Sequence, residues 1–112
     1  MLQIQESRKG RFLVLALTGK LDGASYEDFA DRLTALIEAG ERRVVLDLSA
    51  LTYVNSMGLR TLGTAARTLA PLDGCLALVG TRGNVAEVLT VSGFIGVLPS
   101  FPTLEEAERA IR

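Results

Sequence analysis

The sequence predicts an α/β fold, with a single mixed, mostly parallel β-sheet of four to five strands packed against about four α-helices. Residues 12–18, 43–48 and 75–79 are largely apolar runs of the kind that suits strands covered on both faces. In the segments between and after these runs, apolar residues recur at helical spacing. Strand–helix alternation of this kind is typical of helices that pack on a mostly parallel sheet.

The first third of the chain predicts two strands and a helix. Residues 2–7 alternate weakly between apolar and polar side chains and suit an edge strand, and a glycine-containing turn follows it. Residues 12–18 form the first buried strand, and residues 19–24 a loop. Ser25 opens a capping box that begins a helix, and Gly40 stands where a left-handed residue would end it. The apolar stripe of this helix comprises Tyr26, Phe29, Ala30, Leu33, Leu36 and Ile37.

The middle of the chain predicts a strand followed by a second helix. The strand over residues 43–48 breaks at residues 49–50, and a short apolar stretch then runs to Val54. From Ser56 the apolar period becomes helical, and the helix should end near Leu69 because a proline and an Asp-Gly pair follow. The apolar positions of this helix are Leu59, Leu62, Ala66 and Leu69.

The last third predicts a core strand at residues 75–79 and two shorter helices. The first begins after Asn84, ends at Gly93, and turns Val85, Val88 and Leu89 inward. Residues 94–98 should be a loop that enters a last strand. The final helix starts within residues 102–106, where a second capping box occurs, and its inner face comprises Leu104, Ala107 and Ile111.

Size and composition indicate one small domain over residues 1–112, without repeats or linkers. The formal net charge of −1 argues against nucleic acid as a partner, because phosphate binding needs a basic surface. The start of the chain lacks the basic lead and apolar core of a signal peptide, and no apolar run approaches the ~20 residues that span a bilayer. We therefore expect a cytoplasmic protein without a membrane partner.

The chain has no histidine, which removes the usual general base and the commonest metal ligand. Cys75 is the single cysteine and lies in an apolar run, as a structural thiol would. Asp22, with Asp28 and Asp31, suits the solvated start of a helix better than a metal site. Residues 80–84 lack the Gly-Lys-Ser/Thr ending of a phosphate-binding loop. We expect no enzymatic activity, no metal and no cofactor.

The residues with the most telling position are Asn55 and Ser56, which lie where extended chain becomes helix. The start of a helix exposes unpaired N–H groups and a partial positive charge. Asparagine and serine are common caps at such an end. A phosphate is favoured at the same position for the same physical reasons.

The string around these two residues resembles the signature of the STAS domain, and in particular that of bacterial anti-sigma factor antagonists. In that family an Asp-Leu-Ser-like strand end, here residues 47–49, is followed by a hydrophobic pair and then by Asp-Ser-(Ser/Thr/Ala)-Gly. Residues 53–58 read Tyr-Val-Asn-Ser-Met-Gly, so Asn55 and Met57 depart from the pattern. Residues 17–22 are similar to the Gly-x-Leu-Asp loop that precedes the family's first helix. The resemblance spans essentially the whole chain and implies a STAS-type fold.

The resemblance also implies a function in partner switching. The family's phosphorylated serine matches Ser56, so the unphosphorylated protein would bind an anti-sigma factor that is also a serine kinase. Phosphorylation of Ser56 would end that binding, and a serine phosphatase would restore it. Met57 and Gly58 suit an apolar contact and a close backbone approach, although Met57 also suits an inward position and Arg60 a solvated one. The expected contact surface comprises Asp22, Gly23, Asn55, Ser56, Met57, Gly58 and Arg60.

Two other interpretations remain open at this point. Asn55 keeps the shape and hydrogen-bonding oxygen of aspartate but loses its charge, which fits a STAS adaptor that is never phosphorylated. Such an adaptor would be a subunit of a lipid-transport or sensory complex. The second alternative is a small nucleotide-binding domain. Self-association, if any, is expected to be limited to a weak homodimer.

Overall fold

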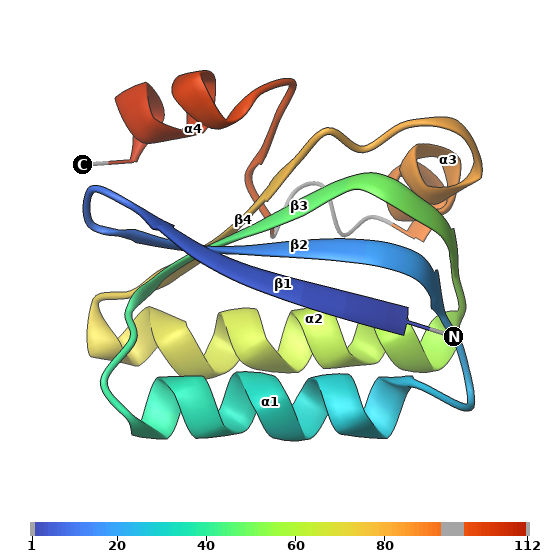
Figure 1. The fold of residues 1–112 in the computed structure, drawn as a ribbon, viewed down its shortest axis with the longest axis horizontal. Helices are drawn as coiled ribbons and strands as arrows, with labels where there is room; N and C mark the ends of the chain where they lie inside the picture. Colours follow the sequence, from blue (N-terminus) through green and yellow to red (C-terminus); the bar gives the residue numbers. More distant parts are fainter. Residues whose placement is uncertain (1, 93–97, 112) are drawn as a thin grey trace.

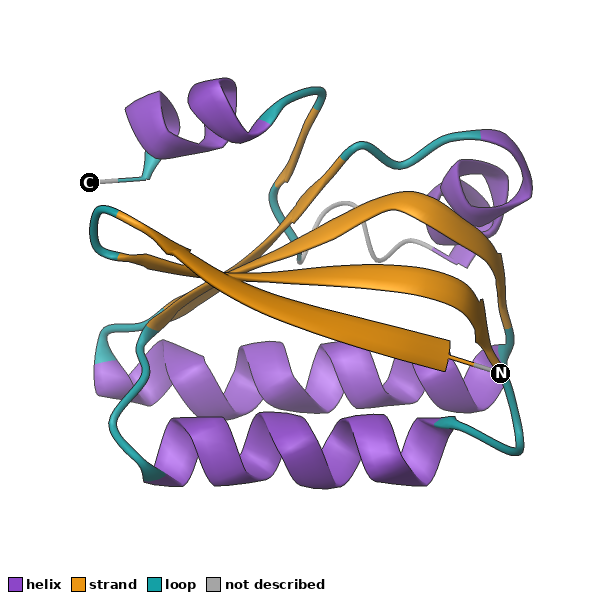
Figure 2. Cartoon of the chain, viewed as in Figure 1, coloured by secondary structure: helices purple, strands orange, loops and turns teal. Residues whose placement is uncertain are grey.

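A computed structural model describes residues 2–92 and 98–111, which form one five-stranded sheet with helices on both of its faces (Figures 1 and 2). The strands are β1 (Leu2–Lys9), β2 (Phe12–Leu21), β3 (Arg43–Val54), β4 (Cys75–Val79) and β5 (Ser100–Phe101), adjacent in that order. The α-helices are α1 (Tyr26–Glu38), α2 (Ser56–Leu69), α3 (Gly83–Ser92) and α4 (Leu104–Ala110). β1 is antiparallel to β2, and the other three pairs are parallel. The predicted fold class and the edge position of the first strand are confirmed.

The apolar strand runs are buried on both sides of the sheet, as their composition predicts. α1 and α2 lie side by side under one face, and α4 lies over the other (Figure 1). The main core lies on the α1 and α2 side and includes Leu15, Leu46 and Leu78, each with no exposed surface. A smaller cluster on the α4 side includes Val45 and Ala107. The central strands therefore fix the position of the loops that follow their carboxyl ends.

β2 and β3 are longer than the sequence predicts. β2 continues to Leu21, so residues 19–21 belong to a strand and not to a loop. β3 runs without interruption over 12 residues, and the break predicted at residues 49–50 is wrong. The pairing of β2 with β3 is irregular between Ala16 and Thr18 and again between Gly19 and Lys20. At both points β3 carries one more residue than β2, as in a β-bulge, which the strand accommodates by bending rather than by ending.

Hydrogen bonds to the side chain of Asp47 explain the first irregularity, which lies between Ala16 and Thr18 in the β2–β3 pairing. Oδ1 of Asp47 accepts hydrogen bonds from the amide and the hydroxyl of Ser49, at 3.1 Å and 2.8 Å. The extra residue thus finds partners within β3, because an aspartate side chain readily bonds to backbone two positions on. A serine that suggests a strand end in the sequence marks a bulge in the structure.

The helix ends agree with the sequence at most points but not at Ser25. α1 ends in a Schellman motif, in which the amides of Gly40 and Glu41 donate to the carbonyls of Ile37 and Leu36 and Gly40 has a φ of +107°. Thr103 caps α4 by accepting from the amide of Glu106, as predicted, and α2 ends at Leu69. The capping box predicted at Ser25 is wrong, because its side chain makes no cap hydrogen bond. Gly93 and residues 94–97 lie outside the described residues.

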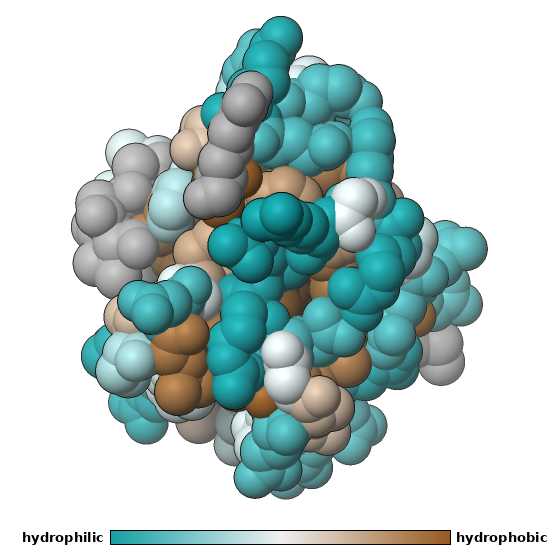
Figure 3. All heavy atoms as spheres, turned by 90° about the vertical axis from the view of Figure 1, so that its left-hand side faces the viewer, coloured by the Kyte–Doolittle hydropathy of each residue, from teal (hydrophilic) through white to brown (hydrophobic). Residues whose placement is uncertain are grey.

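The end of the molecule that carries the β1–β2 turn is mainly hydrophilic (Figure 3). Arg8 forms an ion pair with Glu41, and Lys9 pairs with Glu105 and Glu108 of α4 at 3.2 Å and 3.3 Å. These pairs connect the β1–β2 hairpin to segments distant in sequence. Exposed pairs of this kind contribute little to stability. The chemistry that the sequence singles out lies at the opposite end of the sheet, where β2 and β3 finish.

Candidate functional site at the carboxyl ends of the central strands

Asn55 and Ser56 divide the roles available at the start of α2. Asn55 is the N-cap residue, has extended backbone, and accepts a hydrogen bond from the amide of Gly58 on its Oδ1 at 2.9 Å. Ser56 is the first residue of the helix and is exposed. Within the part of the chain that the structure describes, the Ser56 side chain makes no hydrogen bond. The cap is thus supplied by Asn55, which leaves the Ser56 hydroxyl free at the surface.

The two strings that carried the family resemblance lie next to each other in space. Leu21 at the end of β2 pairs with Val54 at the end of β3. The amide of Asn55 donates to the carbonyl of Leu21 at 3.1 Å, which extends this pairing to the start of α2. The Asp22–Gly23 segment therefore begins beside the Asn55–Ser56 junction, as the carboxyl ends of parallel neighbours must.

Asp22 organises the loop between β2 and α1. Its Oδ1 accepts from the amide of Ala24 at 3.1 Å and from the hydroxyl of Ser25 at 3.2 Å. The Ser25 hydroxyl lies 2.9 Å from the carbonyl of Lys20 and also accepts from the amide of Asp22. The Ala24 amide, and to a smaller extent the Ser25 hydroxyl, hold the pKa of the Asp22 carboxyl below its usual value. Asp22 is therefore a charged, half-buried loop residue, whereas the neighbouring Gly23 is exposed.

Gly58 brings α2 close to the sheet. A Cβ at this position would lie 2.8 Å from Cγ of Leu21 and 2.9 Å from Cγ2 of Val54, which is closer than real Cβ atoms approach. Gly58 is buried, so the close approach that we expected here is made by side chains of its own chain. The glycine fixes the distance between the start of α2 and the ends of β2 and β3.

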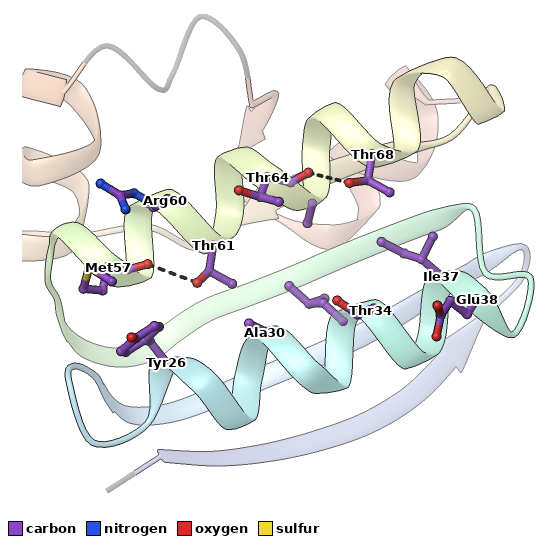
Figure 4. Close-up of a pocket in the computed structure, with 12 residues that line it drawn as sticks. Tyr26, Ala30, Thr34, Ile37, Glu38, Met57, Arg60, Thr61, Thr64 and Thr68 are labelled. Atoms are coloured by element: carbon purple, nitrogen blue, oxygen red, sulfur yellow. Dashed lines mark hydrogen bonds between the residues drawn. The ribbon is translucent and has the colours of Figure 1, made fainter.

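Met57 stands at one end of a groove between α1 and α2 (Figure 4). The groove has a volume of about 310 Å³, and Tyr26 lies opposite Met57 across its end. The hydroxyl of Thr61 donates to the carbonyl of Met57 at 3.0 Å, so this groove residue is already hydrogen-bonded within α2. Met57 is half-buried, which lies between the inward and the exposed positions that the sequence allowed. The sequence places Tyr26 on the apolar stripe of α1, but its position at the groove could not be predicted, because the groove depends on the spacing of two helices.

Arg60 is exposed on α2 and adds positive charge to this end of the molecule. In the described part of the chain it forms no ion pair, and the first turn of α2 has no acidic residue. Lys20, opposite Tyr53 in the β2–β3 pairing, is exposed as well. This end of the molecule therefore presents the Asp22 carboxylate together with the exposed cations Lys20 and Arg60.

Cys75 lies outside this site, at the start of β4. It is half-buried, and this burial raises the pKa of its thiol. A protonated thiol is a poor nucleophile. The geometry supports the structural role that the sequence predicts. No helix in the described residues has the length and hydropathy needed to cross a membrane.

Comparison with known families assigns the fold. A family model for the STAS domain matches residues 3–107. The chain belongs to the STAS domain family. The BtrV protein of Bordetella bronchiseptica, which is named as an anti-sigma factor antagonist, is 37% identical over 100 residues that cover 89% of this chain and 86% of BtrV. The STAS-type fold implied by the Asn-Ser-Met-Gly string is thereby confirmed.

Two solved structures share this architecture. An anti-sigma factor antagonist from Mycobacterium paratuberculosis superposes with a TM-score of 0.89 at 23% identity, covering 100% of this chain and 95% of its own. The phosphorylated form of the Bacillus cell fate determinant SpoIIAA gives a TM-score of 0.75 at 22% identity, covering 98% of this chain and 100% of its own. At these identities the likeness establishes the fold.

Proposed function

We propose that this STAS protein is an anti-sigma factor antagonist that works by partner switching. In its unmodified form it binds an anti-sigma factor that is also a serine kinase, and phosphorylation of Ser56 ends the complex. The observation that carries the proposal is the exposed Ser56 hydroxyl on the first residue of α2, next to an N-cap supplied by Asn55. The identity of 37% to BtrV supports the same class of function.

The site needs no catalytic machinery for this role. A kinase brings nucleotide, metal and base, so its substrate has only to present a hydroxyl on a rigid platform. Gly58 and the Asn55 cap hold the start of α2 against β2 and β3 and thereby supply that platform. We therefore propose a regulator without enzymatic activity, which acts in the cytoplasm with a serine phosphatase that restores the unmodified form.

Phosphorylation would act on the complex and leave the fold intact. A phosphate adds about −1.5 to −2 charges and three acceptor oxygens. Ser56 takes part in no cap hydrogen bond in the described structure, so its modification removes no contact of the folded chain. At a closely packed interface the same charge loses its hydration. A change of about 3 kcal/mol, on the order of a hundredfold in affinity, is sufficient for a switch.

The surface that would contact the partner is formed by the two adjoining loops. Asp22 and Gly23 contribute one side, and Ser56 and Met57 the other. Gly58 takes part through the position it gives to α2, since it is itself buried. Asn55 is half-buried and acts mainly as the cap.

The test is the intact mass of the protein after incubation with ATP and the cognate anti-sigma kinase. We expect one added phosphate on the wild type and on Ser7→Ala, which removes an exposed hydroxyl from β1, and none on Ser56→Ala. Binding of the kinase should be retained by Ser56→Ala and weakened by Ser56→Glu. A wild type that stays unmodified by a kinase shown to be active on another substrate would exclude the phosphoswitch. Continued binding in that case would indicate the constitutive adaptor instead.

A further inference from the structure

Arg60 is a cation without a partner in the described structure. The described ion pairs join Arg8, Lys9 and Arg32 to glutamates, and none involves α2. Arg60 and Arg67 are the charged residues of α2, and both are positive. Arg60 is the fifth residue of α2 and lies beyond the first turn, so the helix dipole does not account for a cation there either. Arg60 lines the groove between α1 and α2, but no ion pair of the described residues explains a positive charge at this position.

The position of Arg60 relative to Ser56 supplies an explanation. Residues four apart on a helix are neighbours on one face, about 5–6 Å apart at Cβ. Figure 4 shows the Arg60 side chain extending along α2 toward the end where Met57 lies. Helical side chains lean toward the N-terminus in this way, over the preceding turn. The guanidinium thus extends toward the N-terminal end of α2, of which Ser56 is the first residue.

We propose that Arg60 is the intramolecular partner of phosphoserine at position 56. The inference rests on the proposed phosphorylation of Ser56 and adds the residue that receives the phosphate. A guanidinium offers paired N–H donors that match two phosphate oxygens, and such charge-assisted bonds are the stronger kind. The neutral Asn55 side chain next to the phosphate adds no repulsion to this pair.

Such a pair would make phosphorylation change the surface in two ways. The phosphate adds negative charge beside Met57, and Arg60 is at the same time drawn from solvent onto its own helix. A partner that places an acidic side chain against Arg60 in the unmodified complex would lose that contact as well. Arg60 would thus couple the modification to the loss of a cation from the contact surface.

The experiment measures the second ionisation of the phosphate by ³¹P NMR, in protein with phosphoserine installed genetically at position 56. Because no kinase is needed, the result does not depend on whether Ser56 is a natural substrate. We expect Arg60→Gln to raise the phosphate pKa by about 0.3–0.7 units, the size expected for one exposed ion pair. In Arg60→Lys the phosphate pKa should stay close to the wild-type value. In 0.5 M salt the difference in phosphate pKa between the wild type and Arg60→Gln should become smaller.

The matched control is Arg67→Gln, which removes the same charge from the same helix. Arg67 lies about 16 Å further along the helix axis than Ser56, beyond the screening length at physiological salt, so the phosphate pKa should not change. An unchanged pKa in Arg60→Gln would overturn the proposal, and so would equal rises in both variants. If the kinase does not phosphorylate Ser56 but Arg60→Gln still raises the pKa of the installed phosphate, the proposed function is rejected and the pairing of Arg60 with the phosphate stands.

Discussion

Replacing Gly58 by alanine should destabilise the protein, although alanine is the better helix former. The new Cβ would lie 2.8 Å and 2.9 Å from Cγ and Cδ2 of Leu21 and 2.9 Å from Cγ2 of Val54. Leu21 has no exposed surface and Val54 is 3% exposed, so neither can move away freely. Overpacking of this kind costs about 1–3 kcal/mol, and the gain in helix propensity returns about 1 kcal/mol. Because three atoms of buried side chains would lie under 3.0 Å from the new Cβ, we take the upper part of the overpacking range, about 2–3 kcal/mol, and expect a net loss of roughly 1–2 kcal/mol.

Urea unfolding followed by circular dichroism measures this loss. With an m-value of about 1–3 kcal/mol per molar, the midpoint should fall by roughly 0.5–1 M. Gly23→Ala is the matched control, because a Cβ at Gly23 would meet no atom within 4 Å. Its midpoint should stay the same or rise slightly, since alanine restricts the unfolded chain more than glycine does. A Gly58→Ala protein as stable as the wild type would refute the close packing of α2 on Leu21 and Val54.

Three further predictions concern Asn55, Asp22 and Cys75. Asn55→Ala removes the cap on the Gly58 amide and should cost about 1 kcal/mol in urea unfolding, whereas Asn55→Asp, which keeps a cap oxygen, should cost less than half as much. The folded-state pKa of Asp22 is lowered chiefly by the Ala24 amide, so its contribution to stability is present above the unfolded value near 3.9 and is lost as pH falls through the folded value. Unfolding midpoints between pH 5 and pH 2 should therefore decline less steeply in Asp22→Asn, and an identical decline would contradict this reasoning. Burial raises the thiol pKa of Cys75, so its alkylation by iodoacetamide at pH 7.5 should be slower than that of a small thiol such as glutathione and should speed up on unfolding.

The sequence predicts the elements of this fold well because their apolar patterns are strong. The stripe of α1 places Phe29 and Leu33 in the core, and the apolar run of β4 is buried from Leu76 to Val79. Burial is sufficient to specify these elements, because a stripe at helical spacing suits a helix packed on one face and a short apolar run between turn signals suits a covered strand. For elements that are specified by burial of their apolar residues, the sequence pattern and the structure agree.

The same patterns fail where polar residues belong to strands. Lys20 lies in β2 and Ser49 in β3, yet both suggest loop in the sequence. Each is tolerated because backbone pairing between the two strands continues past the bulges, and such pairing is not visible in one strand's composition. Ser25 fails for a related reason, because its hydroxyl bonds to Lys20 and Asp22 across a loop whose path depends on β2.

The candidate site could be predicted as a set of residues but not as an arrangement. The Asn-Ser-Met-Gly string indicated a helix start and a family, and both are confirmed. Which of Asn55 and Ser56 caps the helix could not be predicted, because both side chains can do so. Gly58 suggested contact with another molecule, whereas its neighbours are Leu21 and Val54. Those neighbours come from two strands, one of them 37 positions earlier in the chain, so only the assembled sheet explains the glycine.

Asn55 caps α2 and Ser56 does not, and this difference affects how a phosphorylation switch can operate at the start of a helix. If the Ser56 hydroxyl capped α2, phosphorylation would remove a structural hydrogen bond and the helix end would loosen with each cycle. Because Asn55 holds the Gly58 amide, the platform is independent of the state of Ser56. A neutral cap is also compatible with a phosphate on the next residue, whereas a carboxylate cap would repel it. If Ser56 is phosphorylated as proposed, Asn55 would favour a folded phosphorylated state, and its departure from the family's usual aspartate is compatible with the proposed modification.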